Sequence, residues 1–185
     1  IEPEDSSKVK TAKPMVMDRY KIKQDVEGYR YKKLYSHLYL FDIEKKKTDT
    51  LTKGAFNHGA AVWSPTGAQI AFVSNRTADP DKNGNTDIYI MDAKPGAAPK
   101  AITTWTGSDG NPQWSPDGQR IVYTRSTSPD NYHMYDQAVL AVVGKDGGEP
   151  ILLSKDLDRP VLAPYWEKEG KSIIARVADD RYQYP

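Results

Sequence analysis

The side chains best suited to chemistry in this chain are oxygen donors in one short segment, Asp79-x-Asp81-x-Asn83-Gly84-Asn85-x-Asp87. Oxygen ligands at alternate positions around a glycine turn match the first nine positions of an EF-hand-like calcium loop. The glutamate expected at the twelfth position is missing, because Ile90 stands there, and the segment joins two expected strands instead of two helices. The pattern leaves two interpretations open: a calcium site formed by Asp79, Asp81, Asn83 and Asp87, or a long polar hairpin in which Asp87 bonds nearby backbone. We expect no other cofactor.

The three histidines, His37, His58 and His133, are scattered, and none has a partner at a metal-ligand spacing. We expect His37, which precedes a strand, to be a structural residue, and His58 to lie in a loop. His133 belongs to a long connection over residues 127–137. This connection also carries Tyr132, Met134 and Tyr135. It either faces a substrate or a neighbouring domain, or is a plain packed loop.

Arg76 and Arg125 follow the expected second strands of two successive units. An arginine there can receive a carboxylate or a partner domain, or it is solvated or paired within its own unit. No G-x-S-x-G elbow occurs, and the segment 107–110 (G-S-D-G) lacks the spacing and the strand-to-helix setting of a nucleophile. We therefore predict no catalytic residue in this chain.

The elements that must position these residues come from a repeat. Trp63-Ser64-Pro65-Thr66-Gly67 returns 51 residues later as Trp114-Ser115-Pro116-Asp117-Gly118, and a weaker copy, Trp166-Glu167-Lys168-Glu169-Gly170, follows after another 52. The structural repeat residues are Trp63, Gly67, Trp114, Gly118, Trp166 and Gly170. A period near 50 with strand-like segments indicates a stack of small sheets, each burying its faces against its neighbours.

Each part of the motif has a physical role. Tryptophan ends the innermost strand and offers a large apolar face to the adjacent unit. Ser-Pro-Asp-Gly then builds a turn, because proline presets φ and glycine accepts a positive φ. The expected strands are 61–64, 69–74, 87–91 and 100–103 in one unit, 112–115, 120–125, 138–143 and 150–153 in the next, and 162–166 and 172–177 in the last.

Four short strands per unit predict an all-β partial β-propeller of about three to four four-stranded antiparallel blades, with an incomplete ring. The expected segments are a polar linker or frayed end (1–13), a partial blade (14–54), two blades (55–104 and 105–154) and a truncated blade (155–185). In the partial blade we expect a strand over 14–22, a turn or hairpin over 24–33, and strands over 37–43 and 48–52.

Composition excludes several classes of protein. The chain has 185 residues, a net charge of +1 and no cysteine. Balanced charge argues against a nucleic-acid binder, and no apolar run is long enough to span a membrane. Without cysteine, neither a disulfide framework nor a thiolate metal site can form. The chain starts at Ile1 and stops as a strand begins, so we interpret it as a piece of a longer protein. The compartment, bacterial cytoplasm or periplasm, stays undetermined.

The repeat W-S-P-D-G-x-x-I-x-(F/Y), followed by D-I-Y-x-M-D and a short L-T or I-T strand, resembles the WD40-like (PD40) repeats of two groups. One group is the TolB proteins; the other is the amino-terminal propeller of the prolyl oligopeptidase (S9) superfamily of serine peptidases. Residues 18–29, 36–42, 51–54 and 74–89 are closer to the peptidases, in particular to the acylaminoacyl and dipeptidyl branches. In that family the catalytic serine, aspartate and histidine lie in a later α/β-hydrolase domain, so no catalytic residue is carried over.

The resemblance implies a non-catalytic propeller segment of a serine exopeptidase, a hydrolase. Its expected partners are short peptides and the α/β-hydrolase domain of the same parent chain. We expect neither nucleic acid nor a membrane as a partner. Open blade edges further predict self-association. The first alternative is a TolB-like interaction propeller without a catalytic domain, and the second is an independent module that binds glycans or makes calcium-dependent contacts.

Overall fold

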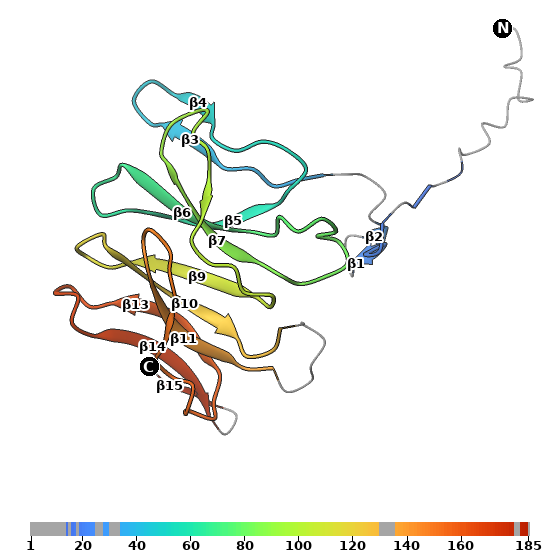
Figure 1. Cartoon of the computed structure of the whole chain (residues 1–185). Helices are drawn as coiled ribbons and strands as arrows, with labels where there is room; N and C mark the ends of the chain where they lie inside the picture. The colour runs from blue at the N-terminus through green and yellow to red at the C-terminus, as the bar shows by residue number, and fades with distance from the viewer. Residues whose placement is uncertain are drawn as a thin grey trace, which may run out of the picture. The chain divides into compact units, whose positions relative to one another are not determined.

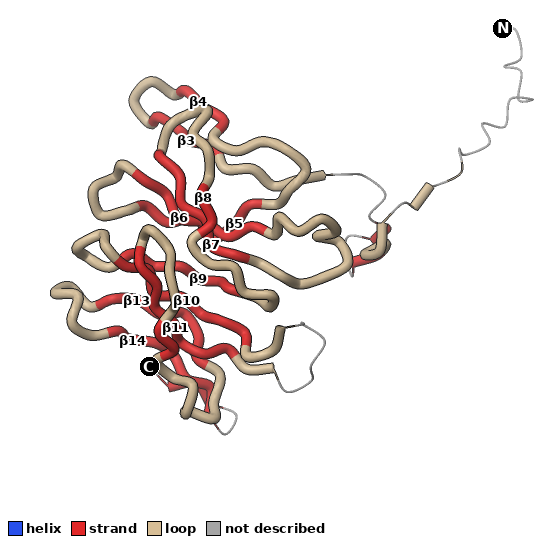
Figure 2. The backbone as a smooth tube through the Cα atoms, in the orientation of Figure 1, coloured by secondary structure: helices blue, strands red, loops and turns tan. Residues whose placement is uncertain are grey.

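The computed structural model describes residues 14, 16, 17, 19–24, 28, 29, 34–129, 136–179 and 182–184. The chain forms two compact units, residues 1–34 and 35–185. The described residues form strands and loops without any helix (Figure 2), so this part of the chain contains no helix that could cross a membrane. The expected linker over 1–13 and the tip of the 127–137 connection, with His133, lie outside the described residues.

The described residues of the first unit include a small hairpin, in which β1 (Lys23–Gln24) pairs antiparallel with β2 (Gly28–Tyr29). A hairpin was expected in this region. The strand expected over residues 14–22 is wrong, because the described residues of that range lie outside any strand. Its apolar side chains Met17, Tyr20 and Ile22 are exposed. Alternating apolar residues stabilise a strand only where a partner strand and a core receive them, and the described residues of this range pair in no ladder.

The second unit is a succession of antiparallel meanders that lie one after another in Figure 1. A half-blade consists of β3 (Tyr39–Asp42) and β4 (Lys47–Thr50). The first blade consists of β5 (His58–Trp63), β6 (Gln69–Ser74), β7 (Asp87–Asp92) and β8 (Lys100–Ala101). The second blade consists of β9 (Asp109–Trp114), β10 (Arg120–Ser126), β11 (Ala138–Gly144) and β12 (Ile151–Leu152). The third blade consists of β13 (Val161–Trp166), β14 (Ile173–Asp179) and β15 (Tyr182–Tyr184).

The blades stack because each strand presents alternate side chains to opposite faces of its sheet. On β6 of the first blade, Ile70 and Phe72 pack with Tyr89 and Met91 against Leu51 of the half-blade segment. The other face of the first blade packs against the second blade. That core contains Ala71, Ile88, Ile90, Ile102, Trp114, Ile121, Tyr123, Ala141 and Val143. The first blade therefore contributes to two cores, one on each of its faces.

A hydroxyl group just after the fourth strand bonds to the backbone at the third strand at the same place in the half-blade, the first blade and the second blade. Thr103 Oγ1 accepts a hydrogen bond from the backbone N–H of Ile88 at 3.0 Å, and Ser154 Oγ accepts one from Leu140 at 2.8 Å. Thr52 Oγ1 accepts the same bond from Leu38 at 2.8 Å. β3 and β4 are therefore the third and fourth strands of a blade whose first two strands are not among the described residues.

The prediction of an all-β fold built from antiparallel sheets of up to four strands is confirmed. Within the described residues, the stack does not close into a ring. The outer edge strands β8 and β12 have two residues each, whereas the inner edge strands β5 and β9 have six residues each. The segment limits proposed at residues 54, 104 and 154 stay predictions.

Candidate functional site

The innermost strands of three successive blades share a backbone irregularity. The residue three positions before each motif tryptophan has a positive φ: +48° at Ala60, +52° at Asn111 and +45° at Ala163. The ladder with the second strand shifts register at the same three places. A non-glycine residue in this conformation costs about 1–3 kcal/mol and persists where the surrounding structure enforces it, often at functional sites. A β-bulge there leaves backbone groups unpaired and re-aims the side chains.

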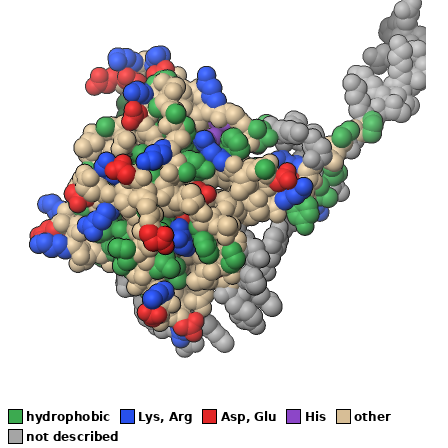
Figure 3. All heavy atoms as spheres, viewed as in Figure 1, with side chains coloured by type: hydrophobic (Ala, Val, Ile, Leu, Met, Phe, Trp, Pro, Cys, Tyr) green, Lys and Arg blue, Asp and Glu red, His purple; other side chains and the backbone are tan. Residues whose placement is uncertain are grey.

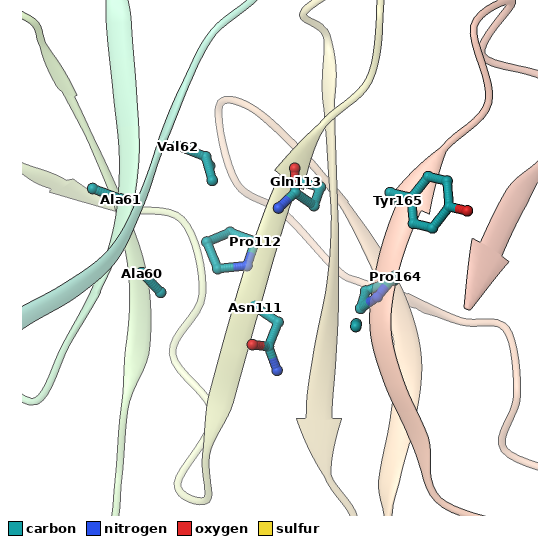
Figure 4. Close-up of a pocket in the computed structure, with 9 residues that line it drawn as sticks. Ala60, Ala61, Val62, Asn111, Pro112, Gln113, Pro164 and Tyr165 are labelled. Atoms are coloured by element: carbon teal, nitrogen blue, oxygen red, sulfur yellow. The ribbon is translucent and has the colours of Figure 1, made fainter. Parts of the chain in front are cut away.

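These bulges line a pocket of about 370 Å³ across the three inner strands. Figure 4 shows the side chains that line this pocket on β5, β9 and β13, including the polar Asn111 and Gln113 on the middle strand. The lining residues are Ala60, Ala61, Val62, Asn111, Pro112, Gln113, Ala163, Pro164 and Tyr165. Pro112 and Pro164 have no N–H to donate, which is consistent with an interrupted ladder at these positions. We call this hollow the inner-strand groove.

The repeat tryptophans tie each inner strand to the one before it. Trp114 Nε1 donates to the backbone oxygen of Val62, and Trp166 Nε1 donates to that of Gln113, both at 3.3 Å. Trp63 is 51% exposed whereas Trp114 is 8% exposed. The difference arises because the half-blade before Trp63 contributes no inner strand among the described residues.

The turn after each tryptophan also repeats. Gly67, Gly118 and Gly170 have φ values of +70°, +66° and +72°. Ser64 and Ser115 accept a hydrogen bond from the residue that follows the turn, at 3.0 and 2.9 Å. In the weaker third copy a carboxylate replaces the hydroxyl. Glu167 accepts hydrogen bonds from the backbone N–H groups of residues 169, 171 and 172, and these bonds lower its pKa.

The second blade contains a buried ion pair. Arg125 Nε and Nη2 donate to the two carboxylate oxygens of Asp109, each at 2.8 Å. The guanidinium lies over the rings of Trp105 and Tyr123, with Cζ at 5.4 and 5.5 Å from the ring centroids. The Asp109 side chain is fully buried. A bidentate contact of this kind fixes both groups within one blade.

Asp87 lies close to this pair at the interface of the first and second blades. Burial raises the pKa of Asp87 to about 6; the negative charge of Asp109 adds to the increase, and a hydrogen bond from Thr103 opposes it. Thr103 Oγ1 donates to Asp87 Oδ1 at 3.1 Å. Asp87 is therefore an interface carboxyl group whose charged form is disfavoured.

The first blade contains a similar arginine, Arg76, which also lies over two aromatic rings but contacts a histidine instead of a carboxylate. Arg76 Cζ lies 4.7 Å from the Tyr89 ring centroid and 5.4 Å from that of Phe56. Its Nη2 is 3.0 Å from His58 Nε2, and His58 Nδ1 is 3.1 Å from the backbone oxygen of Ser36. Burial lowers the pKa of His58, and the charge of Arg76 lowers it further. Because a guanidinium can only donate, His58 Nε2 accepts from Arg76, and the ring proton lies on Nδ1, which donates to the backbone oxygen of Ser36.

His37 joins the same cluster, because its ring centroid lies 5.4 Å from that of His58. Although these two histidines are scattered in the sequence, their rings meet in the fold. They are 21 residues apart, and only the pairing of successive blades brings them together. The bulges were also missed, although a proline within a strand pattern, as at Pro112 and Pro164, is a signal for one.

The side chains of the expected calcium loop make hydrogen bonds within the protein. Asn83 Oδ1 accepts from Asn75 Nδ2 at 2.7 Å, and Asn83 Nδ2 donates to Thr77 Oγ1 at 3.0 Å. Asp79 pairs with Lys82 at 3.4 Å. Across the described ranges, no three His, Asp or Glu side chains gather where they could hold a metal ion. Calcium binding by Asp79, Asp81, Asn83 and Asp87 stays a prediction.

Acidic and basic side chains alternate over the face shown in Figure 3, without a broad patch of one sign. This pattern agrees with the net charge of +1. A nucleic-acid interface needs clustered positive charge, which this face does not offer.

Comparison with known proteins identifies relatives of this fold. Residues 28–141 match the family described as the TolB beta propeller domain, PD40. The uncharacterized peptidase YuxL of Bacillus subtilis is 32% identical over 119 residues, which are 63% of this chain and 16% of that protein. The chain thus spans less than a fifth of the length of this relative.

Two solved structures share the arrangement of strands. TolB from Acinetobacter baumannii superposes with a TM-score of 0.59 and 21% identity, covering 80% of this chain and 33% of that one. A prolyl endopeptidase superposes with a TM-score of 0.56 and 13% identity, covering 81% of this chain and 24% of that one. At these identities the likeness shows the fold alone. Together with the family match, it confirms a propeller-type domain.

Proposed function

The chain belongs to the TolB β-propeller domain family, and on that premise we propose that it is the non-catalytic propeller segment of a serine exopeptidase of the acylaminoacyl or dipeptidyl type. In this proposal the catalytic serine, histidine and aspartate belong to an α/β-hydrolase domain of the same parent chain. Sequence identity of 32% with a peptidase over 63% of this chain supports the peptidase branch.

The inner-strand groove carries the proposal. The strand ladder is interrupted by a bulge in each of three blades along this groove. Backbone groups that such a bulge leaves without a ladder partner are groups that an extended peptide can contact. A groove of about 370 Å³ accommodates a short peptide segment and excludes a folded domain. The propeller would therefore act sterically, by admitting short peptides to the hydrolase domain and excluding folded proteins.

A peptidase assay on the native full-length protein tests this role. Gln113 lies on the middle strand of the groove, so Gln113→Trp should narrow the passage. We expect a several-fold lower kcat/KM for a short chromogenic peptide in this variant, with the reaction of a small ester unchanged. Gln119→Trp, on an exposed turn of the same blade, is the control. An equal kcat/KM for the peptide in Gln113→Trp and in the wild-type protein would contradict the proposed steric role of the propeller.

The second candidate is a TolB-like interaction propeller without a catalytic domain. The family match over residues 28–141 and the superposition on TolB support it equally well. A native full-length protein that folds and shows no hydrolase activity would favour this candidate.

We further propose that the chain binds a second copy of itself. Tyr39 and Phe41 on β3 are 59% and 57% exposed, whereas Tyr89 and Met91, at the same positions of β7, are buried against the preceding blade. The exposed face of β3 is therefore suited to another blade, which a second copy of this chain can supply. Sedimentation of the 185-residue chain should show a dimer that Phe41→Lys dissociates. A wild-type monomer at all concentrations would refute this.

A further inference from the structure

We propose that Arg76, His58 and His37 form a binding site for a carboxylate group, beside the first blade. This site is separate from the inner-strand groove, and the inference does not depend on the parent protein being a peptidase. It rests on an unmatched positive charge, on buried nitrogen atoms without partners, and on a comparison with the equivalent position of the second blade.

The comparison between the blades is direct. His58 and Asp109 both stand five residues before a motif tryptophan, and each contacts an arginine that lies over two aromatic rings. In the second blade the partner is a carboxylate, so the charge of Arg125 is neutralised within the fold. In the first blade the partner is a neutral imidazole. No carboxylate lies within ion-pair distance of Arg76 in the part of the chain that the structure describes.

Two nitrogen atoms of this cluster are buried without a hydrogen-bond partner, namely Arg76 Nε and His37 Nδ1. Buried polar groups are nearly always hydrogen-bonded, and Arg76 Nε can only donate, so its orphaned N–H indicates a missing acceptor. His58 has no free ring nitrogen to bind a ligand, because its two ring nitrogens contact Ser36 and Arg76. Its role is to position the guanidinium. Arg76 Nε supplies one free donor, and His37 Nδ1 supplies a second in the tautomer that carries its proton on Nδ1.

The shape of the site favours a planar anion. The Phe56 and Tyr89 rings lie near the guanidinium carbon at 5.4 and 4.7 Å, so they restrict approach over the faces of the group. A ligand therefore meets the guanidinium along its edge. Carboxylates bind guanidinium in this coplanar, bidentate manner. The chemical class of ligand is thus a carboxylate, from either a peptide C-terminus or an acidic side chain.

Proton NMR of the histidine rings tests the site, since the chain has only three histidines. Sodium acetate should shift the ring resonances of His37 and His58 with a dissociation constant in the millimolar range, beyond the effect of sodium chloride at equal ionic strength. Arg76→Gln should abolish the shift. Arg120→Gln should retain it, because Arg120 lies over Trp166 in another part of the stack.

A second variant keeps the test valid if Arg76→Gln fails to fold. His58→Asp supplies an internal carboxylate, as Asp109 does for Arg125, so it should fold and lose the response to acetate. N-acetylalanine and N-acetylaspartyl methylamide then distinguish the two sources of the carboxylate. Tighter binding of N-acetylalanine would assign the site to peptide C-termini, and tighter binding of N-acetylaspartyl methylamide would assign it to acidic side chains. Equal shifts from acetate and chloride, or an unchanged acetate response in His58→Asp, would overturn the proposal.

Discussion

Trp114 should contribute far more to stability than Trp63, although the two tryptophans occupy the same position in the repeat. The test is to replace each with alanine in the 185-residue chain. Trp114 is buried between the first and second blades and donates to Val62, whereas about half of the Trp63 side chain is exposed. The comparison isolates inter-blade packing from the local turn chemistry that both residues share.

The structure sets the expected magnitudes. Truncating a buried tryptophan costs about 3–5 kcal/mol, from lost burial and the cavity that remains. Trp63 is 51% exposed, so its truncation loses about half of that area and should cost about 1–2 kcal/mol. The difference of about 2–3 kcal/mol corresponds to roughly 4–12 °C in Tm for a chain of this size.

Urea denaturation followed by circular dichroism measures the two free energies of unfolding, and thermal scans provide the Tm values. Trp114→Phe is the companion variant, because it keeps an aromatic ring but loses the N–H donor to Val62. It should cost about 1–2 kcal/mol. Equal losses for Trp114→Ala and Trp63→Ala would refute this reasoning, because they would show that packing on a preceding inner strand contributes nothing.

Three further predictions concern the polar interface and one close backbone approach. Burial raises the pKa of Asp87 from an ordinary value of 3.8 to about 6 in the folded state. Between about pH 4 and pH 6 the folded protein therefore binds more protons at Asp87 than the unfolded chain does, so the wild-type protein loses stability as the pH rises through this range. The Tm of Asp87→Asn should therefore rise relative to wild type over that range, and the exposed control Asp156→Asn should show no such trend. Arg125→Met should cost about 3–5 kcal/mol in urea denaturation, because it leaves the Asp109 charge buried and unpaired; a loss below about 1 kcal/mol would contradict this. Gly107→Ala should destabilise the protein by about 1–3 kcal/mol, because the new Cβ would clash with a backbone oxygen and a serine hydroxyl. An unchanged Tm in this variant would contradict the prediction, because it would show that the backbone shifts there without cost.

The strands could be predicted closely where the repeat and local alternation agreed. The strand expected over 69–74 is observed as β6 (Gln69–Ser74), and the strand expected over 120–125 is observed as β10 (Arg120–Ser126). Both carry β-branched and aromatic residues between turn residues, which is a local signal. The strand expected over 14–22 had the same alternation but no repeat to support it, and it is absent from the described residues of that range.

The candidate sites were harder to predict, because they depend on contacts between blades. The spacing of residues 79–87 suggested a metal loop, yet only the structure shows that Asn83 is engaged inside the hairpin and that Asp87 lies beside a buried carboxylate. Likewise, the sequence does not reveal that His37 and His58 meet. Long-range pairing decides such contacts, and no local pattern encodes it.

Labelling with a fluorophosphonate serine-hydrolase probe tests the proposed peptidase role most directly. The native full-length protein and the 185-residue chain would be treated side by side under folding conditions. We expect the full-length protein to be labelled and this chain to remain unlabelled, because the nucleophile belongs to a separate domain. A folded full-length protein that resists labelling would contradict the peptidase assignment, and labelling of this chain alone would contradict its non-catalytic role.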